Sequence, residues 1–536
     1  MAQIEAIGRI GSRGGFRQKF PRYSDLLKNT WVLLAACGLV AIAGGLYIVQ
    51  PRMATMFVAA IVAVPVARLV WLRPVYGLVA LVFLAASFVQ PNLISLRLLG
   101  GGLDMRDITL LGLLGIGVTK GILRKKLQVP WWPVSLPLLV YFGIAIFSGL
   151  FAVLLQGVST NWAFSELRAI FYIAAFFATA WNIEKARDMF ILLISLIILA
   201  DLTAAVILMQ QFLGRDNLLL SAMLGNGWYL RSVGDAAGDF GDVRVVPPGN
   251  VMMYMVAIIS FALMLQANQP SRRRLFFIGQ FIFLAVAILF TYTRAQWIAS
   301  ALAMALVVAF IPGADKKRLI RYLLVIVVVA GIVSSVFSGD LQKFLEKEQF
   351  IGNVVARALT IFTPEATLET NSLQWRAFEN GEAIKSIALH PLLGVGLGNA
   401  YRDITLLQWE DRRFYFRKTR FVHNSYLYIT VKMGIPGLAA FLAFSLSFVV
   451  CGWLALRKMA EGDFKRITVA ILASYIGLLL WSNSQMHFMS VESTAVVGLM
   501  VGMVAAMSKI KQEGGAVAQP EPLFISRRAN QLRGEA

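Results

Sequence analysis

The chain is built from apolar stretches of about twenty residues, separated by short polar segments that carry most of the charge. A helix of about twenty residues crosses a hydrocarbon core of about 30 Å, and lipid cannot satisfy a bare backbone. The pattern therefore predicts an all-α polytopic membrane protein with about fourteen transmembrane helices. We expect spans near residues 31–49, 53–71, 75–95, 107–120, 133–155, 167–183, 189–212, 249–267, 275–292, 295–311, 319–338, 435–456, 466–483 and 489–507.

Two longer polar segments interrupt this pattern. The first, 213–248, is rich in Gly and Asp, and the second, 339–422, is about eighty residues of mixed charge. A connection as long as the second is seldom passive, so we expect a large, partly helical functional loop between the eleventh and twelfth spans. Within it, apolar side chains recur at helical spacing and predict a helix over 374–389.

The distribution of Lys and Arg along the chain predicts its orientation in the membrane. The chain is 58% hydrophobic and 15% charged, with a net charge of +21. If the N-terminus is cytoplasmic and the spans alternate, nearly all short basic clusters fall on one side, as the positive-inside rule requires. They include RLVWLR (68–73), KGILRKK (120–126), PSRRR (270–274), DKKRLIR (315–321) and RKMAEGDFKR (457–466). Both termini are thus predicted to be cytoplasmic and both long segments to face outward. The positive charge then needs no nucleic-acid partner.

This organisation divides the chain into six parts. They are a basic cytoplasmic N-terminus (1–30), N-terminal transmembrane helices (31–274), transmembrane helices with a TYTR turn (275–338), the large outer loop (339–422), C-terminal transmembrane helices (423–508) and a cytoplasmic tail (509–536). The two cysteines, Cys37 and Cys451, lie in apolar stretches, so no disulfide framework or metal cluster is indicated.

His423 is one of only three histidines, with His390 and His487. It begins HNSYL at the outer membrane boundary, just before GIPG (434–437) and the next span. An imidazole there could take up or release a proton near neutral pH. A hydrogen bond to a loop carbonyl is the alternative, and the spacing alone favours it.

A basic cluster lies just upstream on the outer side, where the positive-inside rule does not explain it. Its members are Arg412, Arg413, Arg417, Lys418 and Arg420. Guanidinium groups at a membrane surface could bind a phosphate or pyrophosphate bidentately. Contact with anionic lipid headgroups explains the cluster equally well.

Two other arginines are candidates. Arg294 ends TYTR (291–294), which joins two spans with almost no loop, so its charge must lie at the outer rim of the bundle; snorkelling is the alternative. Arg376 lies in the outer loop and indicates little alone. The glycines of HPLLGVGLG (390–398) mark tight turns, and the absence of a βαβ context argues against a dinucleotide site. Arg244, in the first outer segment, could add to a phosphate site.

Charged residues also occur within or at the ends of the spans. Asp201 lies mid-span, which makes it a functional candidate unless a polar neighbour satisfies it. Several others gather at outer helix ends, where they could line a cavity or pair with one another. These are Asp104, Arg106, Asp107, Glu166 and Arg168.

Taken together, these motifs resemble the O-antigen ligase and O-antigen polymerase superfamily of bacterial envelope glycan transferases. The family pattern is a Thr-x-Ser-Arg-like turn followed by a large periplasmic loop with an Arg near a Trp, Pro-Leu-Leu-Gly-x-Gly, His-Asn-x-x-Leu and Gly-Ile-Pro-Gly. This chain has TYTR (291–294), WR (375–376), HPLLGVGLG (390–398), HNSYL (423–427) and GIPG (434–437) in the same order. Thr293 replaces the usual Ser, and Gln296 lies near a position where Gly is common.

The resemblance implies transfer of a glycan from undecaprenyl diphosphate to an acceptor hydroxyl on the periplasmic face of the bacterial inner membrane, with no metal, nucleotide or other cofactor. It implies that Arg294 and Arg376 hold the diphosphate, and that His423 activates the acceptor hydroxyl or helps to organise the acceptor site. We expect further substrate contacts from Asn424, Arg244 and the basic cluster. The expected partners are the lipid-linked donor, a glycan or lipid A-core acceptor, membrane lipids and other polysaccharide assembly proteins.

The acceptor decides among three activities in this superfamily. A ligase would pass a finished chain to lipid A core, and a polymerase would lengthen O-antigen or exopolysaccharide. A protein O-oligosaccharyltransferase is a third relative. The competing class is a lipid-linked oligosaccharide flippase or transporter, which Asp201 and the number of spans favour. Transporters often show repeated halves with broken helices, and the sequence shows no such repeat.

Overall fold

The computed structural model describes residues 65–86, 88, 96–98, 101–125, 128–213, 229–232, 243–266, 269–322, 371–403, 405–409, 412–416 and 419–510. The chain forms two compact units, Met1–Leu72 and Arg73–Ala536. Apart from the helix Pro65–Leu72, every element discussed below belongs to the second unit. The spans predicted at 31–49, 53–71 and 319–338 lie wholly or mostly outside the described residues.

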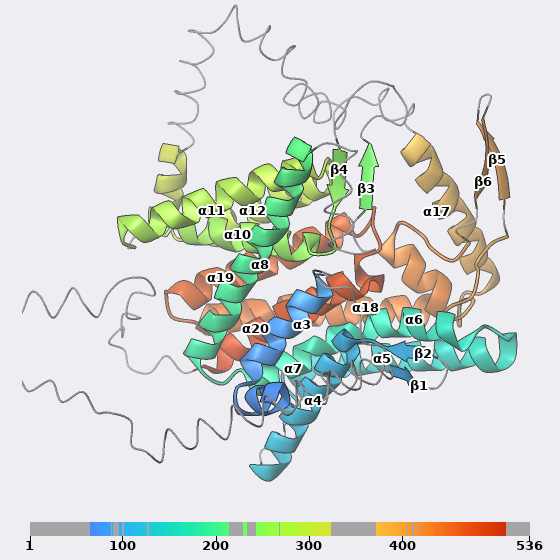
Figure 1. Ribbon diagram of the computed structural model, residues 1–536, viewed down its shortest axis with the longest axis horizontal. Helices are drawn as coiled ribbons and strands as arrows, with labels where there is room; N and C mark the ends of the chain where they lie inside the picture. The colour runs from blue at the N-terminus through green and yellow to red at the C-terminus, as the bar shows by residue number, and fades with distance from the viewer. Residues whose placement is uncertain are drawn as a thin grey trace, which may run out of the picture. The chain divides into compact units, whose positions relative to one another are not determined.

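The described part is mainly helical (Figure 1). Its α-helices are α3 (Pro74–Ala85), α4 (Met105–Leu123), α5 (Trp132–Gln156), α6 (Thr160–Phe171), α7 (Ala175–Asn182), α8 (Ala186–Leu213), α10 (Asn250–Met264), α11 (Ser271–Phe290), α12 (Arg294–Phe310), α17 (Asn371–Leu389), α18 (Ser425–Lys458), α19 (Asp463–Trp481) and α20 (Val491–Lys509). The 3-10 turns η2 (Tyr172–Ala174) and η3 (His487–Met489) connect α6 to α7 and α19 to α20.

Three antiparallel hairpins complete the described elements. They are β1 (Leu96–Leu98) with β2 (Gly101–Leu103), β3 (Tyr229–Ser232) with β4 (Val243–Val246), and β5 (Thr405–Trp409) with β6 (Arg412–Phe416). Two of them belong to the segments predicted to face outward.

Within the described residues, seven helices are long and apolar enough to cross a membrane. They are Trp132–Gln156, Thr160–Asn182, Ala186–Gln210, Ser271–Phe290, Ser425–Lys458, Asp463–Trp481 and Val491–Lys509. The count rises to eight if Pro65–Leu72 and Pro74–Ala85 are taken as one interrupted span, and α10 and α12 are shorter apolar helices. The helical, polytopic fold is therefore confirmed, whereas the number fourteen stays a prediction.

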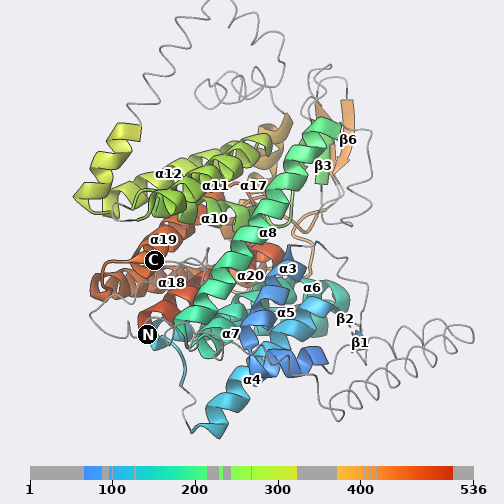
Figure 2. The ribbon, with the colours of Figure 1, turned by 60° about the vertical axis from the view of Figure 1, so that its left-hand side comes forward.

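The centre of the second unit is formed by α10 and α20. Every residue of α10 is buried, and α20 contacts α3, α6, α7, α8, α10, α18 and α19. Helices α10, α11 and α12 lie together, with α19 packed against α10 and α12 (Figure 2). By contrast, α5 and α18 pack on each other and leave large apolar side chains such as Leu154 and Leu446 exposed. Such surfaces suit contact with lipid.

The loop helix predicted over 374–389 is confirmed as α17. Helix α18 begins at Ser425 and is broken at Gly434, and the part after the break coincides with the span predicted at 435–456. The side chain of Asn424 caps this helix, because its Oδ1 atom accepts hydrogen bonds from the backbone N–H groups of Tyr426 (3.0 Å) and Leu427 (3.2 Å). The Gly and Pro residues of GIPG signal a helix end, and here they produce an internal break.

The break in α18 is centred on Gly434, whose φ of 69° and ψ of −176° are not helical. Pro436 has no N–H to donate to the carbonyl of Lys432, four residues earlier. The N–H of Ile435 also leaves the helical ladder and donates to the carbonyl of Pro391 at 2.8 Å. The carbonyls of Val431 and Lys432 are consequently free to accept hydrogen bonds from elsewhere.

A glycine-rich loop, residues 390–398, supplies those hydrogen bonds. Val395 N donates to the carbonyl of Val431 at 2.8 Å, and Gly396 N donates to the carbonyl of Lys432 at 3.1 Å. The hydroxyl of Ser148 on α5 also donates to the Lys432 carbonyl, at 2.8 Å. The loop is thus attached to the break in α18 by backbone hydrogen bonds, and both are attached to α5.

A buried ion pair also stabilises this region. Lys432 is fully buried, and its Nζ lies 3.0 Å from Oε1 of Glu166 on α6. The other carboxylate oxygen, Oε2, accepts from Gly398 N at 2.7 Å, and Tyr428 OH donates to Oε1 at 3.0 Å. The ammonium also donates to the carbonyl of Asn399. Glu166 therefore ties α6, α18 and the loop together.

We predict that Glu166→Ala lowers the free energy of unfolding by about 3–5 kcal/mol, because it leaves the Lys432 ammonium buried without its counter-charge. Thermal unfolding of the purified protein in one detergent measures the change. Glu184→Ala is the matched control, since Glu184 pairs with Arg124 where both side chains are more than half exposed. That exposed pair contributes about 0–1 kcal/mol. Equal losses in the two variants would contradict the role given to Glu166.

Candidate functional site

The TYTR turn between α11 and α12 is held by a buried amide pair. Gln296 Nε2 donates to Asn250 Oδ1 at 2.7 Å, and Asn250 Nδ2 donates to Gln296 Oε1 at 3.1 Å. The hydroxyl of Thr291 also donates to Gln296 Oε1, at 3.0 Å. Within the turn, Tyr292 adopts a left-handed conformation with φ of 48°. These bonds fasten the turn to α10 and place Arg294 at the first position of α12. They also give Gln296 a structural role.

Helix α17 brings a second arginine to the first. Burial lowers the pKa of Arg376, Glu379 opposes this, and the positive charge of Arg294 lowers the pKa further. The two guanidinium groups are therefore close enough to repel each other. Because Arg376 is only partly exposed, water screens this repulsion less than at an open surface. Two like charges held together in this way favour binding of an anion.

Glu379 interacts with the charge of Arg376 and contacts His423. Its side chain has 0% exposure, and its Oε2 lies 2.7 Å from His423 Nδ1. The same oxygen accepts from His423 N at 3.2 Å. The structure thereby brings together Arg294, Arg376 and His423, which the sequence analysis proposed as catalytic, around a buried carboxylate that it missed.

Glu379 had one signal in the sequence. It follows Arg376 by three residues on the predicted helix, so the two must share a face. A glutamate on a helix of an outer loop is normally solvated. Its burial becomes apparent only once His423, 44 positions further along the chain, is placed against it.

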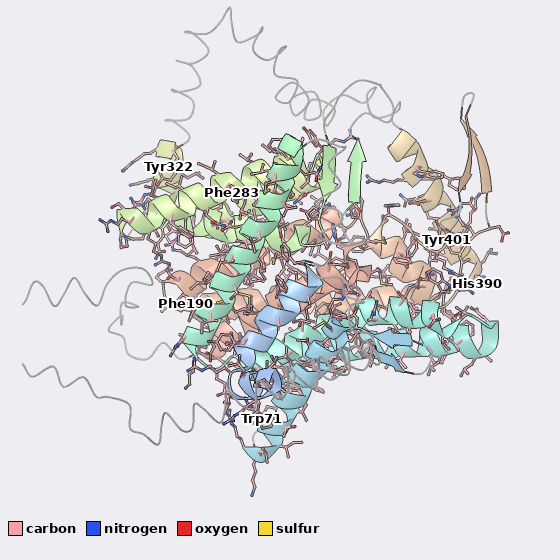
Figure 3. All side chains as sticks on the ribbon, viewed as in Figure 1. Trp71, Phe190, Phe283, Tyr322, His390 and Tyr401 are labelled. Atoms are coloured by element: carbon pink, nitrogen blue, oxygen red, sulfur yellow. The ribbon has the colours of Figure 1, made fainter. Side chains whose placement is uncertain are left out.

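The loop after the glycines holds α17 in place. The guanidinium of Arg402 lies 5.4 Å from the centre of the Phe378 ring on α17 and 5.6 Å from that of Tyr401. Tyr401 OH donates to the carbonyl of Phe421 at 3.3 Å and accepts from Arg402 Nε at 3.2 Å. Burial raises the pKa of Tyr401 to about 12, so it remains a donor at neutral pH. Figure 3 shows Tyr401 near α17 and His390 just beyond that helix.

The residues proposed to bind substrate are more dispersed. Arg412 and Arg413 belong to β6, opposite Trp409 and Gln408 of β5. Arg244 belongs to β4, opposite Arg231 of β3. Arg417 and Lys418 lie outside the described residues.

Arg420 and Asn424 are close to the site, and both have local partners. The guanidinium of Arg420 lies 4.0 Å from the centre of the Trp162 ring on α6, which is a cation–π contact. The side-chain oxygen Oδ1 of Asn424 accepts the two hydrogen bonds that cap α18. Asn424 therefore positions the residue before it, His423, whatever further contact it makes with a substrate.

The charged residues at the outer helix ends pair with one another, as one of the two alternatives proposed. Arg106 Nη2 lies 2.6 Å from Asp104 Oδ2, and Arg168 lies 3.4 Å from both Asp104 and Asp107. Tyr172 OH donates to Asp107 at 2.8 Å. Glu166 belongs instead to the ion pair with Lys432.

The candidate Asp201 and the third histidine, His487, have structural partners as well. Asp201 accepts from Gln280 Nε2 at 2.6 Å, in an open groove between α8 and α11. His487 is buried against Trp481 and Ser493, and this burial lowers its pKa to about 3. It is therefore neutral at physiological pH. Among the residues that the structure describes, no group of three or more His, Cys, Asp and Glu side chains could hold a metal ion.

The fold and these contacts define a polytopic helical membrane protein in which Arg294 of α12, Arg376 and Glu379 of α17, and His423 before α18 come together. Residues 279–442 match the family model of O-Antigen ligase, a segment that includes the TYTR turn, α17 and His423. The resemblance inferred from the motifs is thereby confirmed. No curated protein matches the chain.

We predict that Gly394→Ala destabilises the protein and reduces its activity. Gly394 has a φ of 65°, which costs other residues about 1–2 kcal/mol. A Cβ atom there would also lie 2.5 Å from the Val431 carbonyl oxygen, so the loop must move away from α18. Thermal unfolding and glycan transfer report the two effects.

Gly381→Ala on α17 is the matched control. A Cβ atom at Gly381 would meet no atom within 4 Å, and the residue is in a helix. Alanine should stabilise that helix by about 0.5–1 kcal/mol. If Gly394→Ala unfolds at the same temperature as wild type, the loop does not depend on the left-handed conformation.

Proposed function

We propose that the protein transfers a glycan from a lipid diphosphate to an acceptor hydroxyl. The observation that supports this most directly is the pair of mutually repelling arginines, Arg294 and Arg376, beside His423. A diphosphate carries the negative charge that would relieve this repulsion, and guanidinium groups bind phosphate oxygens bidentately. The match to O-Antigen ligase supports ligase-like glycan transfer. Undecaprenyl diphosphate is the donor lipid that we propose.

The reaction needs one proton transfer and one bond exchange. His423 accepts the proton of the acceptor hydroxyl, whose oxygen attacks the anomeric carbon of the donor sugar. The bond from that carbon to the diphosphate oxygen breaks, and the electron pair leaves with the diphosphate. Arg294 and Arg376 stabilise the negative charge that develops there. The proton on His423 then passes to the leaving diphosphate or to water.

The position of the arginines suits a donor that travels in lipid. Arg294 is the first residue of the apolar helix α12, and Arg376 is on an extramembrane helix that reaches it. The diphosphate of a membrane-bound donor would lie at this boundary, while its isoprenoid chain stays in the hydrocarbon core. We propose that this face is periplasmic and that both termini are cytoplasmic. The bond to the diphosphate supplies the free energy, so no nucleotide takes part.

We predict that Arg294→Ala and Arg376→Ala each lower the rate of transfer about 10²–10³-fold, by removing stabilisation of the leaving group. His423→Ala should lower it about 10²–10⁴-fold, by removing the base. The assay gives the purified protein undecaprenyl-diphosphate glycan and candidate acceptors in the presence of EDTA and without nucleotide. Lengthened donor chains indicate a polymerase, and glycan on lipid A core indicates a ligase.

Arg124→Ala is the control for the loss of a positive charge, because Arg124 forms an exposed pair with Glu184 away from the site. It should transfer at the wild-type rate. If wild type transfers to no acceptor but moves the donor lipid across a reconstituted bilayer, a flippase is the better assignment. Its candidate residue would then be Asp201, despite the hydrogen bond that Asp201 accepts from Gln280.

A further inference from the structure

The contact between Glu379 and His423 restricts which imidazole nitrogen carries the proton. A neutral imidazole has one N–H donor and one acceptor nitrogen, and an ionised carboxylate only accepts. Glu379 Oε2 lies 2.7 Å from His423 Nδ1, a hydrogen-bond distance. Nδ1 must therefore be the protonated nitrogen, which leaves the lone pair on Nε2. Within the described part of the chain, Nε2 makes no hydrogen bond, and the His423 side chain is 32% exposed.

The backbone strengthens this arrangement. The carboxylate oxygen that meets Nδ1 also accepts the main-chain N–H of His423 at 3.2 Å. The next residue, Asn424, caps α18 and so fixes the backbone on the other side. The ring and its main chain are consequently held by the same buried carboxylate, and Nε2 is held in a defined direction.

The charges around Glu379 indicate a second role for this carboxylate, which is to stabilise a protonated His423. Arg376 precedes it by one turn on α17, Arg294 approaches from α12, and Tyr401 and Glu382 are the neighbouring titratable groups. When His423 takes up a proton, a third positive charge forms next to two guanidinium groups. A carboxylate at 2.7 Å offsets that charge directly.

We propose that Glu379 is the positioning residue of the site, holding His423 in the Nδ1–H tautomer and stabilising the imidazolium that forms during transfer. This inference rests on the proposed function for its catalytic meaning, whereas the tautomer can be measured without it. Glu379 does not touch the reacting atoms, and it acts through His423. The same division of labour, with a buried carboxylate behind a histidine base, occurs in serine protease triads.

Glu379→Gln is the informative variant, because it keeps the size of the side chain and removes its charge. The amide can donate as well as accept, so both tautomers of His423 become possible. We expect kcat for transfer to fall about 10²–10⁴-fold, as for loss of the carboxylate in a triad. KM for the lipid-linked donor should stay near the wild-type value, because the arginines are unchanged. Glu382→Gln is the matched control on the same helix, since Glu382 pairs with Lys385 in a more exposed position, and it should behave as wild type.

The tautomer itself is measured by 15N NMR of protein labelled at histidine. The chain contains three histidines, and the signals of His423 are those lost in His423→Gln. We expect wild type to show a protonated Nδ1 and an unprotonated Nε2, and Glu379→Gln to show a mixture. An Nε2–H tautomer in wild type would overturn the proposal, as would unchanged kcat in Glu379→Gln. If wild type transfers no glycan, the proposed function fails, and the NMR spectrum still decides the role of Glu379.

Discussion

The break in α18 is the constraint on which the arrangement of the site depends. Gly434 and Pro436 prevent the helical hydrogen bonds that would use the carbonyls of Val431 and Lys432. In lipid or protein interior, such carbonyls must be paired, and residues 390–398 pair them. That loop begins where α17 ends, and the first turn of α18 begins just after His423. One backbone interruption therefore sets the positions of both the arginine-bearing helix and the histidine.

Two pairs of charges near this loop differ in sign. Glu166 and Lys432 are buried with opposite charges, and the Glu166 carboxylate also accepts hydrogen bonds from Gly398 N and Tyr428 OH. Arg294 and Arg376 carry like charges, and burial together with the charge of Arg294 lowers the pKa of Arg376. An anion bound between two guanidinium groups offsets their repulsion, which is why the proposed function places the donor diphosphate there.

The sequence predicted most features that depend on neighbouring residues and fewer of those that depend on contacts between distant residues. Helices such as α5, α19 and α20 were located within a few residues, because lipid imposes long apolar stretches. The span predicted at 435–456 matches the part of α18 after Gly434, whereas the helical residues 425–433 before the break were not predicted. Arg294, Arg376 and His423 were found by motif. Glu379 and Lys432 were missed, because each is recognisable only through a partner on another element. The predicted number of spans remains untested where the chain is not described.

Helix α17 combines the two halves of the proposed reaction. In the proposed reaction Arg376 would face the leaving diphosphate and Glu379, one turn later, would orient the base, and helix geometry would fix their relative positions. Phe378 between them is covered by Arg402, which comes from the loop attached to α18. A displacement of α17 would therefore disturb leaving-group stabilisation and proton transfer together. Because transfer from an activated lipid diphosphate needs only these two operations, the proposed site consists of two arginines, on α12 and α17, and the histidine that precedes the cap of α18.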